Sequence, residues 1–156
     1  AVSRLEAADW HLSVVGSVTR DPDYAARVQS DILASGLSQR VTLCGELTGT
    51  QLEAAFADAD LLVHTARFES FGMVLTEAIS RGIPVLSTPA GALEVLPQGA
   101  ISEIPAGQPE VWSRKLDSLL GEPQTLREMS AVAAAAVLPS WQDAAAEFES
   151  VLVEVL

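Results

Sequence analysis

Short apolar segments and segments with helix-spaced apolar residues alternate along this chain. Continuous or alternating apolar runs predict strands at residues 10–16, 41–44, 61–65, 84–87 and 100–104. The stretches between them repeat apolar residues every three or four positions, as in an amphipathic helix. Helices and strands that alternate at these intervals predict an α/β domain with a doubly wound parallel sheet. We expect residues 1–156 to form a single domain, because a composition that is 49% hydrophobic supplies one core of ordinary size.

Turn and capping residues predict where the helices begin and end. Asp21 begins a helix that Gly36 ends. Thr50 and Glu53 fit a capping box for a short helix that ends at residue 57. Residues 1–8 are predicted to be the last turns of an amphipathic helix. Helices later in the chain are predicted at residues 109–120, at residues 123–137 and after Ser140.

The stretch from Phe68 to Glu77, F-E-S-F-G-M-V-L-T-E, begins where an apolar strand ends and runs into a helix. In open parallel sheets, ligands bind at such strand-to-helix turns. The first amides of the helix, around Phe71, Gly72 and Met73, have no intrahelical partner and lie at the positive end of the helix dipole. The turn therefore predicts a phosphate or diphosphate site. Gly72 is expected to remove a Cβ atom at the point of closest approach.

Two carboxylates flank the predicted anion site. Glu69 lies just before the helix, and Glu77 lies in its second turn, about 130° from the centre of the apolar stripe. A carboxylate repels a phosphate, so each glutamate is expected to accept hydrogen bonds from hydroxyl groups beside it. A nucleotide sugar has this layout, because sugar and ribose hydroxyls lie on either side of its diphosphate. Helix-dipole pairing and ordinary turn chemistry explain the same residues without a ligand, and spacing alone leaves both interpretations open.

Charge and composition exclude several classes of partner. Nine Lys and Arg residues against 21 Asp and Glu residues give a net charge of −12, so the domain as a whole repels nucleic acids and anionic membranes. Its longest uncharged apolar stretch, residues 131–138, is much shorter than the roughly 20 residues that span a bilayer. Because no signal-peptide pattern begins the chain, we predict a cytoplasmic protein without membrane insertion.

The cysteine and the histidines indicate structural roles. Cys44 lies in an apolar-flanked strand, where a buried thiol is expected rather than a nucleophile. Neither His11 nor His64 has a second ligand at metal spacing, so no metal site and no cofactor are predicted. His64, at the end of a strand, is expected to pack there, with a contact to a bound donor as the less favoured alternative.

The segment E-S-F-G-M-V-L-T-E-A-I-S-R-G-I-P-V resembles the signature of the retaining glycosyltransferases with the GT-B fold, family 4 (glycosyl transferases group 1). That signature has two Glu residues separated by seven positions, and Glu69 and Glu77 match them. The resemblance implies a Rossmann-like C-terminal domain that binds a nucleotide-diphosphate sugar as glycosyl donor. It implies that Glu69 is the catalytic-site residue that holds the transferring sugar and that Glu77 holds the ribose. The implied donor-binding residues are Gly16, Ser70, Phe71, Gly72, Met73, Glu77 and Gly91.

The resemblance also implies parts that would precede Ala1. These are an acceptor-binding N-terminal domain, the first strand of the donor domain, and an Arg and a Lys that bind the diphosphate. We therefore expect a truncation, a split gene product or a degenerate relative that is inactive alone. Without that strand, residues 10–16 and 61–65 would pair directly or leave a slot between them. Ala90 stands where the family has the first of two glycines.

Two other functions stay open at this point. An orphaned donor-like domain would serve as a non-catalytic structural or interaction module. A sugar-nucleotide epimerase with the GT-B fold is the second, and it fits the spacing of Glu69 and Glu77 less well. Binding of a uridine or guanosine diphosphate sugar would separate the transferase domain from the non-catalytic module.

Overall fold

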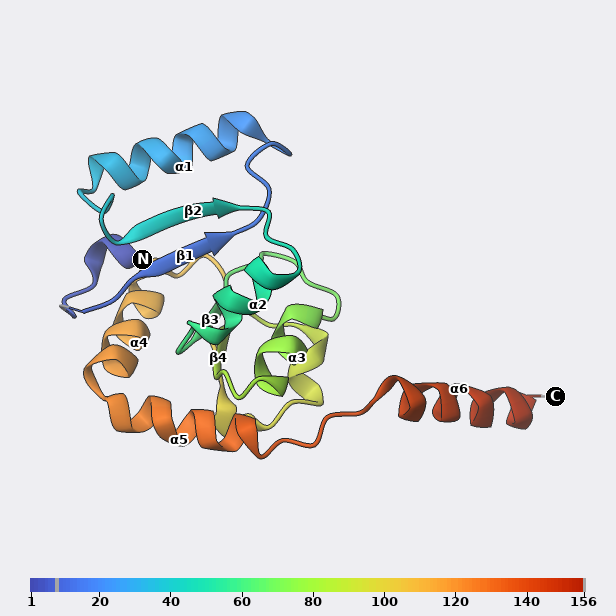
Figure 1. The fold of residues 1–156 in the computed structure, drawn as a ribbon. Coiled ribbons are helices and arrows are strands. Elements are labelled where there is room, and N and C mark those ends of the chain that lie inside the picture. The colour runs from blue at the N-terminus through green and yellow to red at the C-terminus, as the bar shows by residue number, and fades with distance from the viewer. Residues whose placement is uncertain (8, 156) are drawn as a thin grey trace.

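The computed structural model describes residues 1–7 and 9–155, which form parallel strands and surrounding helices (Figure 1). The strands are β1 (Leu12–Val15), β2 (Val41–Gly45), β3 (Leu62–His64), β4 (Val85–Ser87) and β5 (Ile101–Glu103). The α-helices are α1 (Pro22–Ala34), α2 (Thr50–Ala57), α3 (Met73–Ser80), α4 (Pro109–Gly121), α5 (Pro123–Ala134) and α6 (Trp141–Val155). Each strand lies in a segment that the apolar pattern predicts, and only β2 extends beyond it, by one residue. The predicted α/β class with parallel strands is confirmed.

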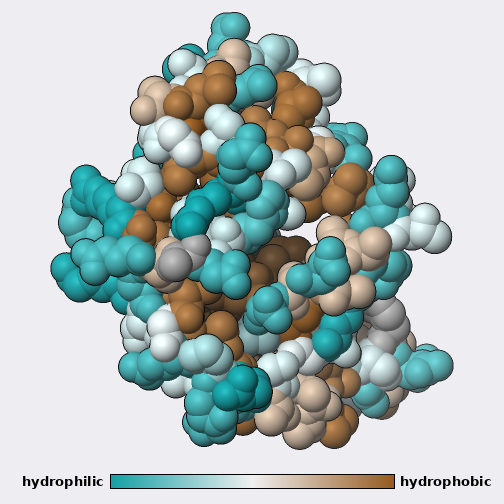
Figure 2. Space-filling view, turned by 60° about the vertical axis from the view of Figure 1, so that its left-hand side comes forward, coloured by the Kyte–Doolittle hydropathy of each residue, from teal (hydrophilic) through white to brown (hydrophobic). Residues whose placement is uncertain are grey.

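The strands form two separate sheets. β1 pairs with β2, and β4 lies between β3 and β5, with every pairing parallel. Within residues 1–7 and 9–155, no strand joins β1 to β3, so the structure has the slot rather than the direct pairing. Figure 2 shows a hollow with apolar residues inside it, below the upper part of the molecule that holds α1, β1 and β2.

The two-stranded part has a thin core. Val14 and Val15, which point to opposite faces of β1, are 40% and 42% exposed. No residue of α1 is buried, and the structure describes that helix in full. The four-residue spacing of Tyr24, Val28 and Ile32 predicts an apolar face for α1, but Tyr24 is exposed as well. An unpaired strand edge and half-covered faces leave this part with fewer buried apolar contacts than the rest of the domain.

The three-stranded part holds the main core, because β4 is covered on both of its faces. Val85 packs in one cluster with Leu75, Ala78 and Ile79 of α3. Leu86, the next residue, packs on the other face in a cluster that includes two residues of α4, Trp112 and Leu116. The apolar spacing of this segment predicts a core stripe of Val74, Leu75, Ala78 and Ile79; the last three are buried, and Val74 is partly buried against the same cluster. This packing holds the turn between β3 and α3 on a rigid support.

Two local predictions near helix ends are wrong. Residues 1–7 contain only a 3-10 turn, Val2–Arg4, and Ala8 lies outside the described residues. The amides of Glu6 and Ala7 donate to the Asp117 carboxylate of α4, at 2.8 and 3.1 Å. Those bonds to another helix replace the helical bonds that the local pattern predicts, so the segment is extended there.

The predicted capping box at the start of α2 does not form. Gly49, with φ +53°, takes the N-cap position, and Thr50 is already helical. The Glu53 carboxylate instead accepts a 2.7 Å hydrogen bond from Arg81, just after α3. Arg81 also lies over the Phe56 ring, with 4.5 Å from its guanidinium carbon to the ring centroid. Tertiary contacts therefore decide the role of Glu53.

The last helix, α6, stands apart from the rest of the molecule in Figure 1. Ser140 caps it as predicted, because the Asp143 amide donates to the Ser140 hydroxyl at 3.1 Å. The Ser140 hydroxyl and amide both donate to the Asp143 carboxylate at 2.7 Å. These hydrogen bonds hold the pKa of Asp143 below its ordinary value. Neither α6 nor another helix in the described ranges is long and apolar enough to cross a membrane.

Candidate functional site

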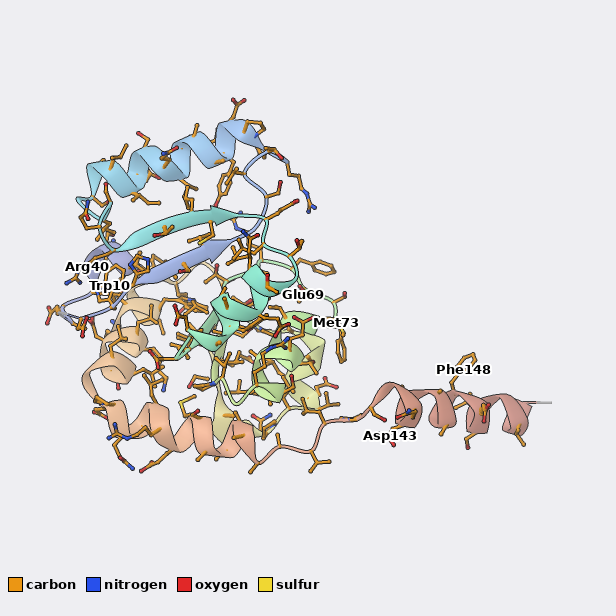
Figure 3. The ribbon with its side chains drawn as sticks, in the orientation of Figure 1. Trp10, Arg40, Glu69, Met73, Asp143 and Phe148 are labelled. Carbon is orange, nitrogen blue, oxygen red and sulfur yellow. The ribbon has the colours of Figure 1, made fainter. Side chains whose placement is uncertain are left out.

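The candidate site is the turn that joins the carboxyl end of β3 to the N-terminus of α3. Glu69 and Met73, which belong to this turn, lie on the side toward which the arrows of β1 and β2 point (Figure 3). Gly72 is the N-cap residue of α3 and has left-handed dihedral angles, φ 89° and ψ 58°. A glycine adopts these angles at little cost, so the chain can turn sharply from the strand into the helix. The turn therefore occupies the ligand-binding edge of a parallel sheet.

A second loop holds the turn in place. The amide of Gly91 donates to the Ser70 carbonyl at 3.2 Å, and the amide of Ala92 donates to the Phe71 carbonyl at 2.7 Å. A Cβ atom on Gly91 would lie 2.5 Å from the Ser70 oxygen, inside any allowed contact. Gly91 is therefore a glycine because two backbones touch at that position. The two loops form one unit.

These hydrogen bonds also orient the amides that the anion site requires. The peptide bonds are trans, so the N–H of each peptide points opposite to its carbonyl. Because the Ser70 and Phe71 carbonyls face Gly91 and Ala92, the amides of Phe71 and Gly72 point away from that loop. They join the Met73 amide at the positive end of the α3 dipole. The arrangement suits an anion in front of the turn.

The expected reason for Gly72 needs correction. A Cβ atom at this position would meet the Leu75 Cδ1 atom at 3.0 Å and the Glu69 Cγ atom at 3.3 Å. It would point toward these side chains rather than into the space before the amides. Gly72 is needed for the left-handed turn and for its close packing against Leu75 and Glu69.

Glu69 faces an open pocket of about 500 Å³ beside the turn. The pocket is lined by Glu69, Pro89, Ala90, Gly91, Leu93, Glu94, Gln98 and Glu103. Three carboxylates and one amide thus line it, and carboxylate oxygens accept hydrogen bonds from hydroxyl groups. The Glu69 side chain is 30% exposed, so its oxygens can reach a ligand. The pocket is chemically suited to a ligand rich in hydroxyls.

His64 connects Glu69 to the end of the neighbouring strand. Its Nε2 atom lies 3.7 Å from Oε2 of Glu69, and its Nδ1 atom lies 3.1 Å from the Ser87 hydroxyl. The His64 side chain is 15% exposed. The prediction that His64 packs at the end of its strand is therefore confirmed. The structure adds the contact with Glu69, which the sequence did not reveal.

The remaining predicted residues are less closely tied to the pocket. Glu77 is half-buried on α3, and its backbone carbonyl accepts hydrogen bonds from the side chains of Ser80 and Arg81. Gly16 follows β1 directly, and its amide donates to the Gly45 carbonyl at 2.8 Å. It therefore belongs to the other sheet. The ribose role of Glu77 and the nucleotide role of Gly16 stay predictions.

Sequence reasoning missed Glu103, Ser87 and Thr88, which lie at or just after the carboxyl ends of β4 and β5. Ser87 pairs in register with His64 on one side and with Glu103 on the other. The Thr88 hydroxyl donates to the Ala66 carbonyl at 2.7 Å and so holds the start of the turn. Their position at or near the carboxyl ends of predicted strands was a usable signal, since ligands gather at that edge of the sheet.

Comparison with known proteins identifies the family. The family model described as Glycosyl transferases group 1 matches residues 1–135. D-inositol 3-phosphate glycosyltransferase of Paenarthrobacter aurescens is 31% identical over 141 residues, covering 88% of this chain and 34% of that protein. The protein of the same name from Nocardia farcinica is 34% identical over 116 residues, covering 73% and 25%. The chain belongs to the glycosyl transferases group 1 family, and it spans about a third or less of these relatives.

Solved structures confirm the fold. Anabaena HepE in complex with UDP-glucose superposes with a TM-score of 0.75 at 23% identity, covering 86% of this chain and 37% of that one. The C-terminal domain of the group 1 glycosyl transferase LpcC from Francisella tularensis gives a TM-score of 0.72 at 21% identity, covering 81% and 67%. The chain therefore has the fold of the C-terminal GT-B domain, as its signature segment predicts.

Proposed function

We propose that this domain binds a nucleotide-diphosphate sugar and serves a retaining glycosyltransferase that moves a hexosyl group to an acceptor hydroxyl. One observation carries the proposal. The hydrogen bonds from Gly91 and Ala92 turn the amides of Phe71 and Gly72 away from that loop, as an anion site requires, and Glu69 faces a carboxylate-lined pocket beside them. A diphosphate and its attached sugar need these two environments next to each other.

The proposed roles follow from the chemistry of each group. The amides of Phe71, Gly72 and Met73 stabilise the charge that develops on the departing diphosphate, because they are preorganised donors. Glu69 accepts hydrogen bonds from hydroxyls of the transferring sugar. Its negative charge also favours the cationic character that builds on the anomeric carbon. Ser70 flanks the diphosphate, Gly91 lines the sugar pocket, Gly16 borders the nucleotide path, and Glu77 accepts from the ribose hydroxyls.

The negative charge of the domain makes the amides necessary. At a net charge of −12, long-range electrostatics oppose the approach of a nucleotide diphosphate. The peptide dipoles at the α3 N-terminus act on a ligand within one helical turn. Distant surface carboxylates do not cancel them, because salt screens charges over such distances. We therefore place recognition of the diphosphate in the turn itself.

Donor binding to the 156-residue chain tests the proposal. UDP-glucose, GDP-mannose and ADP-glucose would be titrated while amide NMR signals are recorded, with UDP, GDP and ADP as controls. We expect one sugar nucleotide to shift the Phe71, Gly72 and Met73 amides and to bind more tightly than its own nucleoside diphosphate. The non-catalytic alternative predicts no shift with any of these compounds. Shifts confined to other parts of the chain would also refute the proposed site.

A further inference from the structure

His64 and Ser87 are the last residues of adjacent parallel strands, and they pair in register. Their side chains consequently meet, with 3.1 Å between Nδ1 of His64 and the Ser87 hydroxyl. The backbone reinforces this contact, because the Thr88 amide donates to the His64 carbonyl at 3.0 Å. The imidazole is therefore held at the edge of the sheet by β4 and not only by its own strand.

The Ser87 hydroxyl decides which ring nitrogen carries the proton. Ser87 is fully buried, and its Oγ atom lies 2.6 Å from the Thr88 carbonyl. A carbonyl only accepts, so the single hydroxyl proton of Ser87 is used there. The Ser87 oxygen must then accept from His64, and the donor is Nδ1–H. In the neutral imidazole, Nε2 is left with a lone pair.

The group beside this nitrogen is the Glu69 carboxylate. Nε2 lies 3.7 Å from Oε2, beyond the length of a hydrogen bond, and two acceptors have no proton to share. With His64 neutral, the Glu69 carboxylate keeps its hydrogen-bonding capacity for the pocket. Protonation of Nε2 reverses this, because an imidazolium would attract Oε2 toward β3 as an ion pair.

We propose that His64 is a positioning residue for Glu69, which it leaves available to the donor sugar when neutral and draws toward β3 when protonated. This inference rests on the proposed function. The ionisable group that contacts the imidazole is Glu69, while β4 presents the uncharged Ser87 and Thr88. Glu94 and Glu103 line the same pocket as Glu69 and add negative charge near it.

The proton assignment is tested on the 156-residue chain by NMR of the two histidine rings. His11 is an internal control, since its Nε2 atom lies 3.0 Å from the Thr42 hydroxyl on the exposed surface. At about pH 8 we expect His64 as the Nδ1–H tautomer. Ser87→Ala should shift its population toward Nε2–H, and Glu69→Gln should move the His64 signals alone. An Nε2–H tautomer in the wild-type chain would overturn the proposal.

Binding tests the positioning role. The affinity for UDP-glucose relative to UDP, or for GDP-mannose relative to GDP, isolates the contribution of the sugar. Between about pH 8 and pH 5 histidine changes its charge, and the terminal phosphate of UDP or GDP, with a second pKa of about 6, gains a proton whichever variant binds it. The reference is therefore His64→Gln, which lacks the imidazole. Relative to that variant, we expect the wild-type ratio to fall about tenfold over this range, the effect of one charged hydrogen bond. His11→Gln is the matched control and should behave like the wild type.

The outcomes separate the two proposals. If binding occurs and His64→Gln keeps the wild-type pH dependence, the role of His64 is refuted while the donor site stands. If no nucleotide or sugar nucleotide binds, the proposed function fails, and the positioning role fails with it. A fall in the ratio that is about tenfold larger in the wild type and in His11→Gln than in His64→Gln supports the inference.

Discussion

Replacement of Gly91 by alanine should force apart the two loops that build the candidate site. The new Cβ atom would lie 2.5 Å from the Ser70 carbonyl oxygen and 3.5 Å from the Phe71 Cα atom. The first distance is 0.9 Å shorter than 3.4 Å, where ordinary van der Waals contact begins. Both neighbouring atoms belong to the backbone, so no side chain can rotate to make room. One of the loops must move.

The size of the effect follows from that displacement. Overpacking of a close contact costs about 1–3 kcal/mol of unfolding free energy. The two hydrogen bonds between the loops, at 3.2 and 2.7 Å, would lengthen together. Each of these hydrogen bonds contributes about 0.5–1.5 kcal/mol. We therefore expect Gly91→Ala to lower the unfolding free energy by about 2–3 kcal/mol, the upper part of the range for overpacking. In a chain of this size, the melting temperature should fall by about 2–4 °C for each kcal/mol.

Urea and thermal unfolding would measure the loss, and sugar-nucleotide titration would measure its effect on the site. Gly121→Ala is the matched control, because a Cβ atom at Gly121 meets nothing within 4 Å. It should be neutral or slightly stabilising. We expect Gly91→Ala to weaken donor binding as well, since the Phe71 and Gly72 amides lose their orientation. Equal stability of both variants, with unchanged donor binding, would refute the argument.

Further predictions concern the two glutamates, Gly72 and the thin core. Glu69→Gln should reduce the affinity for the sugar nucleotide about tenfold and leave that for its nucleoside diphosphate unchanged. A purely structural Glu69 would instead lose up to about 1 kcal/mol of stability and no affinity. Glu77→Ala should weaken the binding of the sugar nucleotide and of the nucleoside diphosphate equally, by about 1.5–3 kcal/mol. Affinities equal to those of the wild type would refute its ribose role. Gly72→Ala should cost about 1–2 kcal/mol because of its left-handed angles, as unfolding curves would show. In hydrogen exchange, amides of α1, β1 and β2 should exchange faster than those of α3 and β4, and equal protection would contradict a thin core.

Local patterns were sufficient to predict most elements of this domain. Short apolar runs produced strands and helix-spaced apolar residues produced helices, because burial on a sheet or on one helix face selects those spacings. The turn from Glu69 to Gly72 was also predictable, since a strand, a glycine and a helix start follow one another directly. Asp21 and Ser140 cap their helices as predicted, because capping acts over three residues.

Contacts between distant parts of the chain decided what the sequence alone left open. The Asp117 carboxylate accepts hydrogen bonds from the amides of Glu6 and Ala7, and Arg81 donates to the Glu53 carboxylate. The helix predicted at residues 1–8 and the capping box predicted at Thr50 therefore do not form. The slot between β1 and β3 depends on which strands pair with each other, and no local sequence pattern encodes strand pairing.

The contacts that build the candidate site are also contacts between distant parts of the chain. Gly91 touches Ser70, and His64 contacts both Glu69 and Ser87. Gly91 and Ser70, and likewise Ser87 and His64, are more than 20 positions apart in the chain. Hydrophobic periodicity reports only which face of an element is buried. Which polar groups meet at the edge of the sheet is set by strand order and register. The residues of the turn could therefore be predicted from the sequence, whereas the orientation of its amides and the partner of its carboxylate were decided by the tertiary structure.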